Sequence, residues 1–106
     1  MLWCDLDPSK GREQAGRRPV VVVASDDYLE VVDTLTIVVP VTSVDRGWPN
    51  HIALTGRPGL AEPSWAMTEQ PRTITRDRVL AVAGAVDATA MGAIDRWLRD
   101  FLALPE

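Results

Sequence analysis

The unbroken apolar run Val20–Ala24 most constrains what this chain can fold into. Four valines follow one another, and Pro19 stands directly before them. β-Branched residues favour strands, and a continuous apolar run bounded by turn residues is typical of a buried strand. Proline is tolerated at the first position of a strand because no interior ladder bond is lost there. The run is far shorter than the roughly 20 residues of a membrane helix, so we expect one globular domain over residues 1–106 and no membrane partner.

Other segments carry weaker strand signals. Leu2–Leu6 and His51–Leu54 alternate apolar and polar residues, which predicts short strands. Thr34–Val39 is predicted to be a strand that ends at Pro40, and a short helix or turn is predicted around Tyr28–Val32. Further strands are expected at Ser64–Gln70 and Val79–Val86, with Arg72–Thr75 between them, and loops at Asp7–Arg18, Asp45–Asn50 and Thr55–Pro63.

The C-terminal segment has the pattern of an amphipathic helix. Asp87 is a favourable N-cap, and Ala88–Leu104 follows it. The residues of its apolar face recur at helical spacing, and they are Met91, Ile94, Leu98, Phe101 and Leu102. Short antiparallel strands, long polar loops and one terminal helix predict a mainly β fold, a small antiparallel barrel with a helix packed on it.

The charge of the chain is unevenly distributed. Its formal net charge is −4, which taken alone argues against a nucleic-acid partner. Two short segments are nevertheless net positive: KGREQAGRR at residues 10–18 and RTITRDR at residues 72–78. Local cations on an acidic body favour contact with a polyanion. The alternative, that surface arginines cluster by chance, stays open.

Several common chemistries are excluded by composition. The chain has one cysteine, Cys4, and one histidine, His51, so it has neither a cysteine pair nor an HExxH motif. It also lacks a Gly-rich phosphate loop. We therefore expect no metal ion and no cofactor, and we expect His51 to be a surface or rim residue. No basic segment followed by an apolar stretch begins the chain, so we expect no signal peptide and a cytoplasmic protein.

The polar residues that remain fit the cleavage of a phosphodiester. Arg17 and Arg18 end the first loop, and Thr42 lies just beyond a predicted strand. Attack by an RNA 2′-hydroxyl needs a fixed cation for the phosphorane oxygens, an acid near the leaving oxygen and an acceptor for the 2′ proton. Arginine is a bidentate donor to phosphate, a threonine hydroxyl can orient it, and Glu13 among arginines would stay ionised. On these residues alone, a structural loop with solvated charges remains an alternative.

A motif around this loop resembles the signature of the MazF/PemK toxin endoribonucleases. The pattern W-x-D-x-D-P-x-x-G-x-E-Q-x-G-x-R-P runs from Trp3 to Pro19. An apolar strand follows, then V-P-V-T at Val39–Thr42, then E-Q-x-R-T-I at Glu69–Ile74 and a C-terminal helix. These matches come in the family's order and span nearly the whole chain.

The resemblance implies an SH3-like barrel that forms a homodimer and binds single-stranded RNA near the subunit interface. It also implies metal-independent cleavage at a short sequence, which leaves a 2′,3′-cyclic phosphate and a 5′-hydroxyl. The family's catalytic arginine falls on Arg18, its catalytic threonine on Thr42 and its acid on Glu13. The expected partner is a cognate antitoxin with an acidic disordered segment. We expect RNA contacts from Lys10, Arg12, Gln14, Arg17, Arg46, Trp48, Gln70 and Arg72.

The chain departs from the family pattern in three places. Arg12 stands where many relatives have serine, which bears on sequence preference rather than on the reaction. The usual R-G-E/D before the first strand is missing, and Pro71 interrupts a strand-like motif, which predicts a bulge or a sheet edge. Trp48 is expected either to stack on bases or to cover apolar surface.

Two other functions stay open. A CcdB-like toxin would poison DNA gyrase on the same barrel without cutting RNA, and it would rely on an aromatic residue near the extreme C-terminus. Here Phe101 is already expected on the apolar helix face. The other function is that of an SH3-like binding module with no activity.

Overall fold

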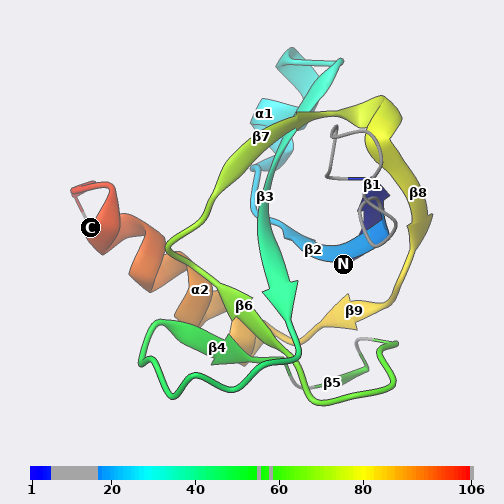
Figure 1. Ribbon diagram of the computed structural model, residues 1–106. Coiled ribbons are helices and arrows are strands. Elements are labelled where there is room, and N and C mark those ends of the chain that lie inside the picture. Colours follow the sequence, from blue (N-terminus) through cyan, green and yellow to red (C-terminus); the bar gives the residue numbers. More distant parts are fainter. Residues whose placement is uncertain (6–16, 55, 58, 106) are drawn as a thin grey trace.

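The computed structural model describes residues 1–5, 17–54, 56–57 and 59–105, and within them the chain is mostly antiparallel sheet with one long helix at its C-terminus (Figure 1). This confirms the predicted fold class. The strands are β1 (Leu2–Asp5), β2 (Arg17–Val22), β3 (Leu35–Thr42), β4 (His51–Ala53), β5 (Gly56–Arg57), β6 (Trp65–Met67), β7 (Arg72–Thr75), β8 (Val79–Val82) and β9 (Ala85–Val86). The helices are α1 (Asp26–Val31), the 3₁₀ turn η1 (Arg76–Arg78) and α2 (Ala88–Phe101).

The main sheet curls on itself. Its pairing order is β4-β6-β3-β2-β1-β8, and β7 pairs with β3 on the edge away from β2. The strands β7 and β8 therefore lie on opposite sides of the β3-β2-β1 core, yet only the 3 residues of η1 separate them. The sheet has to bend until these edges approach each other, and Figure 1 shows β7 and β8 as one arc around β1 and β2. The small pair β5–β9 stands apart from this sheet.

The prediction that Pro40 ends a strand is wrong, since β3 runs through it to Thr42. The amide of Val23 donates to the carbonyl of Ile37 (3.0 Å), and Pro40 pairs with Val20 in the same ladder. Because hydrogen-bonded and non-bonded pairs alternate, the Pro40 nitrogen points away from β2. On that other edge the partner changes from β7, which ends at Val38, to β6, which begins at Val41. Proline therefore loses no ladder bond at this position.

Other boundaries also shift from those predicted. Arg72–Thr75, expected between strands, is the strand β7, because its residues pair with Leu35–Val38 of β3. The segment Ser64–Gln70 shortens to β6, and Val79–Val86 divides into β8 and β9. The short helix predicted around Tyr28–Val32 is confirmed as α1, which begins at Asp26.

Both faces of the central strands are buried, which is why β2 has consecutive valines. Val20 and Val38 lie in one core cluster with Cys4 and Ile74. Val21 and Val39, their neighbours in sequence, lie in a second cluster. Successive side chains of a strand point to opposite faces, so each strand contributes to both clusters. The second cluster also contains Val41, Ala66 and Ile94.

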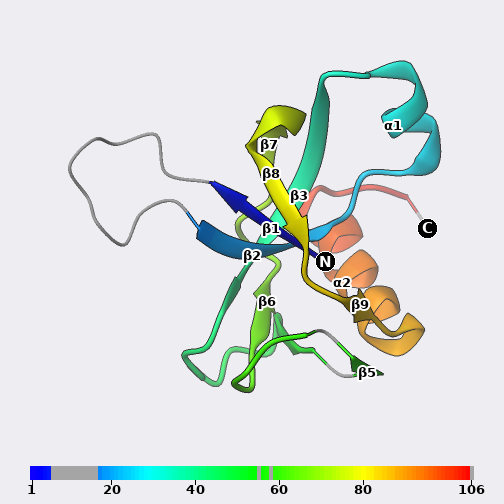
Figure 2. The same ribbon diagram turned by 90° about the vertical axis from the view of Figure 1, so that its right-hand side faces the viewer.

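Helix α2 covers the second cluster from one side of the strands (Figure 2). Asp87 caps it as predicted, and its carboxylate accepts from the amide of Ala90 at 2.9 Å. Ile94 is fully buried, with Met91 and Leu98 packed beside it. Burial of such a side chain contributes about 1.5–3 kcal/mol. No helix among the described residues is long and apolar enough to cross a membrane.

The end of α2 differs from the prediction. The helix stops at Phe101 instead of Leu104, and Ala103 has a left-handed φ of 57°. Phe101 and Leu102 were expected on the buried face, but they are 46% and 56% exposed. The Phe101 ring packs on the Trp97 ring instead, with 5.4 Å between centroids, and neither Phe101 nor Leu102 belongs to the two core clusters.

Arg76 holds α1 against the barrel. Its Nε donates to the carbonyl of Leu35 (2.9 Å), and one terminal nitrogen donates to the carbonyls of Val32 (2.8 Å) and Leu29. These two carbonyls lie at the C-terminal end of α1, where a helix leaves acceptors without partners. This cation of the segment 72–78 therefore serves the fold.

We expect Arg76→Ala to lower the free energy of unfolding by about 1–3 kcal/mol, because three buried or half-buried carbonyls lose a charged donor. Urea denaturation of the two proteins measures the difference. Arg96→Ala is the matched control, since Arg96 lies on the exposed face of α2, and it should change stability by less than about 0.5 kcal/mol. Equal stabilities for the two variants would show that Arg76 does not fasten α1.

Candidate functional site

An open pocket lies where β2 begins and β3 ends. Its volume is about 500 Å³. The strands β1, β2 and β3 and the chain that leads into β6 each contribute to its wall. The lining residues are Trp3, Arg17, Arg18, Pro19, Val41, Thr42, Ser43, Val44, Leu60, Ala61, Glu62 and Ser64.

The register of β2 and β3 places Arg18 beside Thr42. The ladder ends at the pair Val20–Pro40, and each of the two residues lies two positions further along its strand. Since side chains alternate along a strand, both point to the same face as that last pair. The structure thus brings together two of the three residues expected to be catalytic, Arg18 and Thr42, which are 24 positions apart in the sequence, in one pocket.

Arg17 and Arg18 give the pocket its positive charge. Both are exposed. The Arg17 guanidinium carbon lies 4.8 Å from the centre of the Trp3 ring, a cation–π contact between β2 and β1. This contact orients Arg17 along the pocket wall, and Arg18 brings the planar donors of its guanidinium to the same pocket.

The hydroxyl of Thr42 is oriented by its own backbone. Its Oγ1 accepts a hydrogen bond from the amide of Val44 at 3.1 Å. A hydroxyl that already accepts still has its hydrogen to donate. Thr42 can therefore donate to an anionic oxygen held in the pocket.

One wall of the pocket, formed by Leu60, Ala61, Glu62 and Ser64, was not expected from the sequence. Ser64 donates from Oγ to the carbonyl of Glu62 at 3.0 Å, which shapes this segment. Gly59 precedes it with a φ of +76°, and an added Cβ would lie 1.9 Å from the carbonyl oxygen of Ala83. Only glycine fits there. The Gly/Pro composition of this stretch predicted a loop, and nothing in it indicated which strands the loop would approach.

The other expected RNA contacts lie elsewhere. Arg72 pairs with Val38 on β3, four residues from Thr42 and so about 13 Å along the strand. Gln70 is exposed in the turn before β7. Arg46 and Trp48 lie in the exposed loop that follows the pocket residues Ser43 and Val44. Glu13, with the expected contacts Lys10, Arg12 and Gln14, lies outside the described residues.

His51 is buried, so the expectation of a surface or rim histidine is wrong. Its side chain is 2% exposed, and its Nε2 lies 3.0 and 3.1 Å from the two carboxylate oxygens of Glu69. Burial raises the pKa of Glu69, but hydrogen bonds from His51, from a backbone amide and from Gln70 outweigh it and leave this pKa below its usual range. The residue was missed because its partner Glu69 is 18 positions away.

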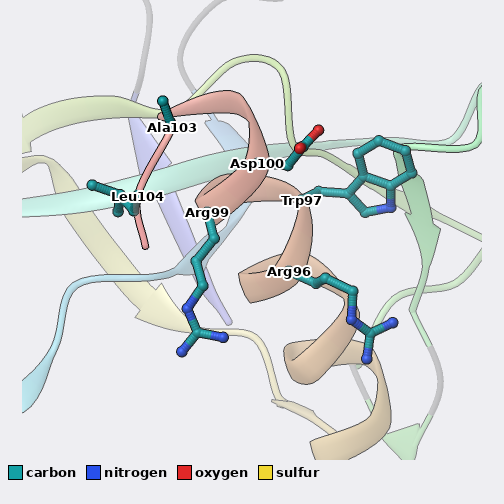
Figure 3. Close-up of a pocket in the computed structure, with 6 residues that line it drawn as sticks. All are labelled: Arg96, Trp97, Arg99, Asp100, Ala103 and Leu104. Carbon is teal, nitrogen blue, oxygen red and sulfur yellow. The ribbon is translucent and has the colours of Figure 1, made fainter. Parts of the chain in front are cut away.

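A second pocket lies on the outer side of α2 (Figure 3), with a volume of about 570 Å³. It contains none of the residues expected in the site. Its lining residues are Arg96, Trp97, Arg99, Asp100, Ala103 and Leu104. Among the described residues, no group of three or more His, Cys, Asp and Glu side chains could hold a metal ion.

Comparison with known proteins identifies the family. Residues 1–102 match the family model described as a PemK-like, MazF-like toxin of type II toxin–antitoxin system. The Mycobacterium tuberculosis protein named Endoribonuclease MazF9 is 35% identical over 105 residues, which covers 92% of this chain and 89% of that protein. Endoribonuclease toxin MazF of Escherichia coli K12 is 40% identical over 57 residues, so the match spans 54% of this chain and half of that protein's length.

Solved structures agree with this assignment. The Deinococcus radiodurans MazE–MazF structure in form II gives a TM-score of 0.79 at 26% identity and covers 98% of this chain and 92% of that one. MazF from the same organism, in form I, gives a TM-score of 0.76 at 27% identity, covering 97% and 92%. The chain therefore belongs to the family of PemK-like, MazF-like toxins of type II toxin–antitoxin systems.

Proposed function

We propose that this protein is the toxin of a type II toxin–antitoxin system and an endoribonuclease that cuts single-stranded RNA in the pocket of Arg18 and Thr42. One observation carries the proposal: the two residues lie on neighbouring strand ends in one open, positively charged pocket. The relatives named endoribonucleases support the reaction class. An RNA substrate would place the protein in the cytoplasm.

The proposed reaction uses the RNA's own 2′-hydroxyl. The 2′ oxygen attacks phosphorus, the bond from phosphorus to the 5′ oxygen breaks, and the products are a 2′,3′-cyclic phosphate and a 5′-hydroxyl. Arg18 stabilises the charge on the phosphorane oxygens, and Thr42 donates to one of them. The 2′ proton passes to a carboxylate, expected to be Glu13, and the 5′ oxygen takes up a proton as it leaves.

Arg18 and Thr42 can be tested separately. We expect Arg18→Ala to slow cleavage by about 10²-fold or more, because one preorganised charge donor is lost. Thr42→Ala should cost about tenfold, because water can replace a hydroxyl in an open pocket. Thr42→Ser keeps the hydroxyl and should recover most of that loss. Cleavage rates of a labelled RNA measure all three.

Both alanine variants should keep the wild-type Tm. Arg18 is exposed, and Thr42 is only half-buried at a strand end. Rates within twofold of wild type for Arg18→Ala would remove Arg18 from the mechanism. A large fall in Tm would instead assign either residue a structural role.

Cleavage should continue undiminished in excess EDTA. The proposed mechanism assigns the stabilisation of phosphate charge to Arg18, with Arg17 beside it, so no divalent cation is required. The measurement compares initial rates with EDTA and with added Mg²⁺ or Mn²⁺. A strict metal requirement would contradict the mechanism. Absence of any RNA cleavage would instead favour the gyrase-directed or non-catalytic alternatives.

We also propose that the protein forms a homodimer and binds an antitoxin whose acidic segment enters the same pocket. The solved structures of the Deinococcus radiodurans relative include structures of MazE–MazF. Apolar side chains available to a second copy include Leu80, Val82, Leu102 and Leu104, each more than half exposed.

An acidic peptide from the cognate antitoxin should compete with RNA, because Arg17 and Arg18 are exposed and would meet its carboxylates in place of phosphates. Fluorescence anisotropy of a labelled RNA, titrated with the peptide, measures the competition. A peptide with its Asp and Glu residues changed to Asn and Gln is the control and should compete weakly. If the protein holds RNA and peptide together without mutual weakening, the shared-pocket model is wrong.

A further inference from the structure

The loop Ser43–Pro49 forms part of the pocket at its beginning. Ser43 and Val44 line the pocket, and the amide of Val44 is hydrogen-bonded to Thr42 Oγ1 at 3.1 Å. Every residue of the loop is exposed. The position of this loop relative to the pocket therefore depends on the contacts that its far end makes.

The far end of the loop is fixed on His51. The ring of Trp48 packs on the His51 ring, with 4.7 Å between centroids and 44° between planes. The amide of His51 also donates to the carbonyl of Trp48 at 3.1 Å. Trp48 remains 48% exposed, so the His51 ring covers only part of its side chain and the rest is exposed to solvent.

Asn50 and Thr68 complete the attachment. Asn50 Nδ2 donates to Glu69 Oε1 at 2.8 Å, and the carbonyl of Asn50 accepts from Thr68 Oγ1, also at 2.8 Å. One carboxylate, that of Glu69, thus binds both His51 and Asn50. The Glu69 side chain is on the turn after β6, so the loop is tied to a different part of the sheet from the one where it starts.

The orientation of the His51 ring is strongly determined. Its Nε2 lies within hydrogen-bonding distance of both Glu69 oxygens, so this nitrogen carries a proton. The His51 side chain is buried while Glu69 is half-buried, so removal of the Glu69 carboxylate would leave the buried Nε2 without its partner. The His51 ring therefore holds the Trp48 indole in one position, and a substitution at His51 should change the position of the loop.

We propose that the His51–Glu69 pair is a positioning unit for the loop Ser43–Pro49, acting through the Trp48 indole and the Asn50 amide to hold one wall of the RNA pocket. The inference rests on the proposed function, because it assigns the pair to substrate binding at that same pocket. His51 and Glu69 do not line the pocket themselves, so they act through the loop. Loss of the His51–Trp48 contact should weaken RNA binding, but it should leave the chemistry of Arg18 and Thr42 unchanged.

A double-mutant cycle between His51 and Trp48 tests the proposal. His51→Gln keeps an N–H donor for Glu69 but removes the ring, and Trp48→Ala removes the indole. We expect each to raise KM about 5- to 20-fold with kcat within about threefold of wild type. The double variant should be no worse than the worse single variant, because both changes remove the same contact. Trp48→Phe keeps a ring and should restore KM to within about threefold.

A matched control separates positioning from lost stability. Ile94→Val weakens the second core cluster under α2, away from the loop, and should lower the Tm by a few degrees without changing KM. All kinetics are measured well below the lowest Tm. If His51→Gln does not fold, Glu69→Gln takes its place in the cycle, since it keeps the size of the side chain and removes the charge.

The outcomes are distinct. If the KM increases of the two single variants multiply in the double variant, Trp48 and His51 act independently, and the proposal is overturned. An unchanged KM with a lowered Tm in His51→Gln would do the same, since the pair would then serve stability alone. A fall in kcat with KM unchanged would place His51 in the chemistry. Wild-type protein that cleaves no RNA would refute the proposed function and remove the basis of this inference, whereas cleavage with an additive cycle refutes the inference alone.

Discussion

The pairing of β2 with β3 is the interaction on which the rest of the structure depends. Both strands are buried on both faces, so Val20 and Val38 belong to one core cluster while Val21 and Val39 belong to the other. A single ladder therefore joins the inside of the curled sheet to the layer under α2. A slip of the register by one residue would move every side chain to the other face, so the packing of both clusters depends on this register. The position of Arg18 opposite Thr42 follows from that register.

The candidate site lies where the pairing of β2 with β3 ends. Beyond the last ladder pair, Val20–Pro40, Arg18 and Thr42 line an open pocket instead of a core. The change of partner along β3, from β7 to β6, brings the segment Leu60–Ser64 to the same place. A rigid core next to an open strand end is a suitable place for charged groups, since the sheet holds their backbones while the side chains stay hydrated.

Local patterns were enough to predict several of the elements, and long-range contacts account for those that were missed, such as β7. The valine run, the cap at Asp87 and the helix face through Ile94 depend on neighbours in sequence, and each was found. The continuation of β3 through Pro40 depends on which edge lacks a ladder partner, and no local pattern contains that information. The burial of His51 beside Glu69 and the exposure of Phe101 also depend on tertiary packing rather than on neighbours in sequence. The juxtaposition of Arg18 and Thr42 was expected only from the family motif.

The charge distribution has a different meaning in the structure from the one it had in the sequence. The sequence of segment 72–78 predicted a second basic surface, but the Arg76 guanidinium donates its hydrogen bonds to the carbonyls of Leu35 and of the end of α1. Arg17 and Arg18, in contrast, are exposed on the pocket wall. A chain with a net charge of −4 can still attract a polyanion at one place, because salt screens surface charges beyond about 10 Å and the nearest cations dominate the local potential. The acidic remainder of the surface then disfavours polyanion binding elsewhere, so the charge imbalance that argues against RNA binding overall is compatible with the proposed binding at this pocket.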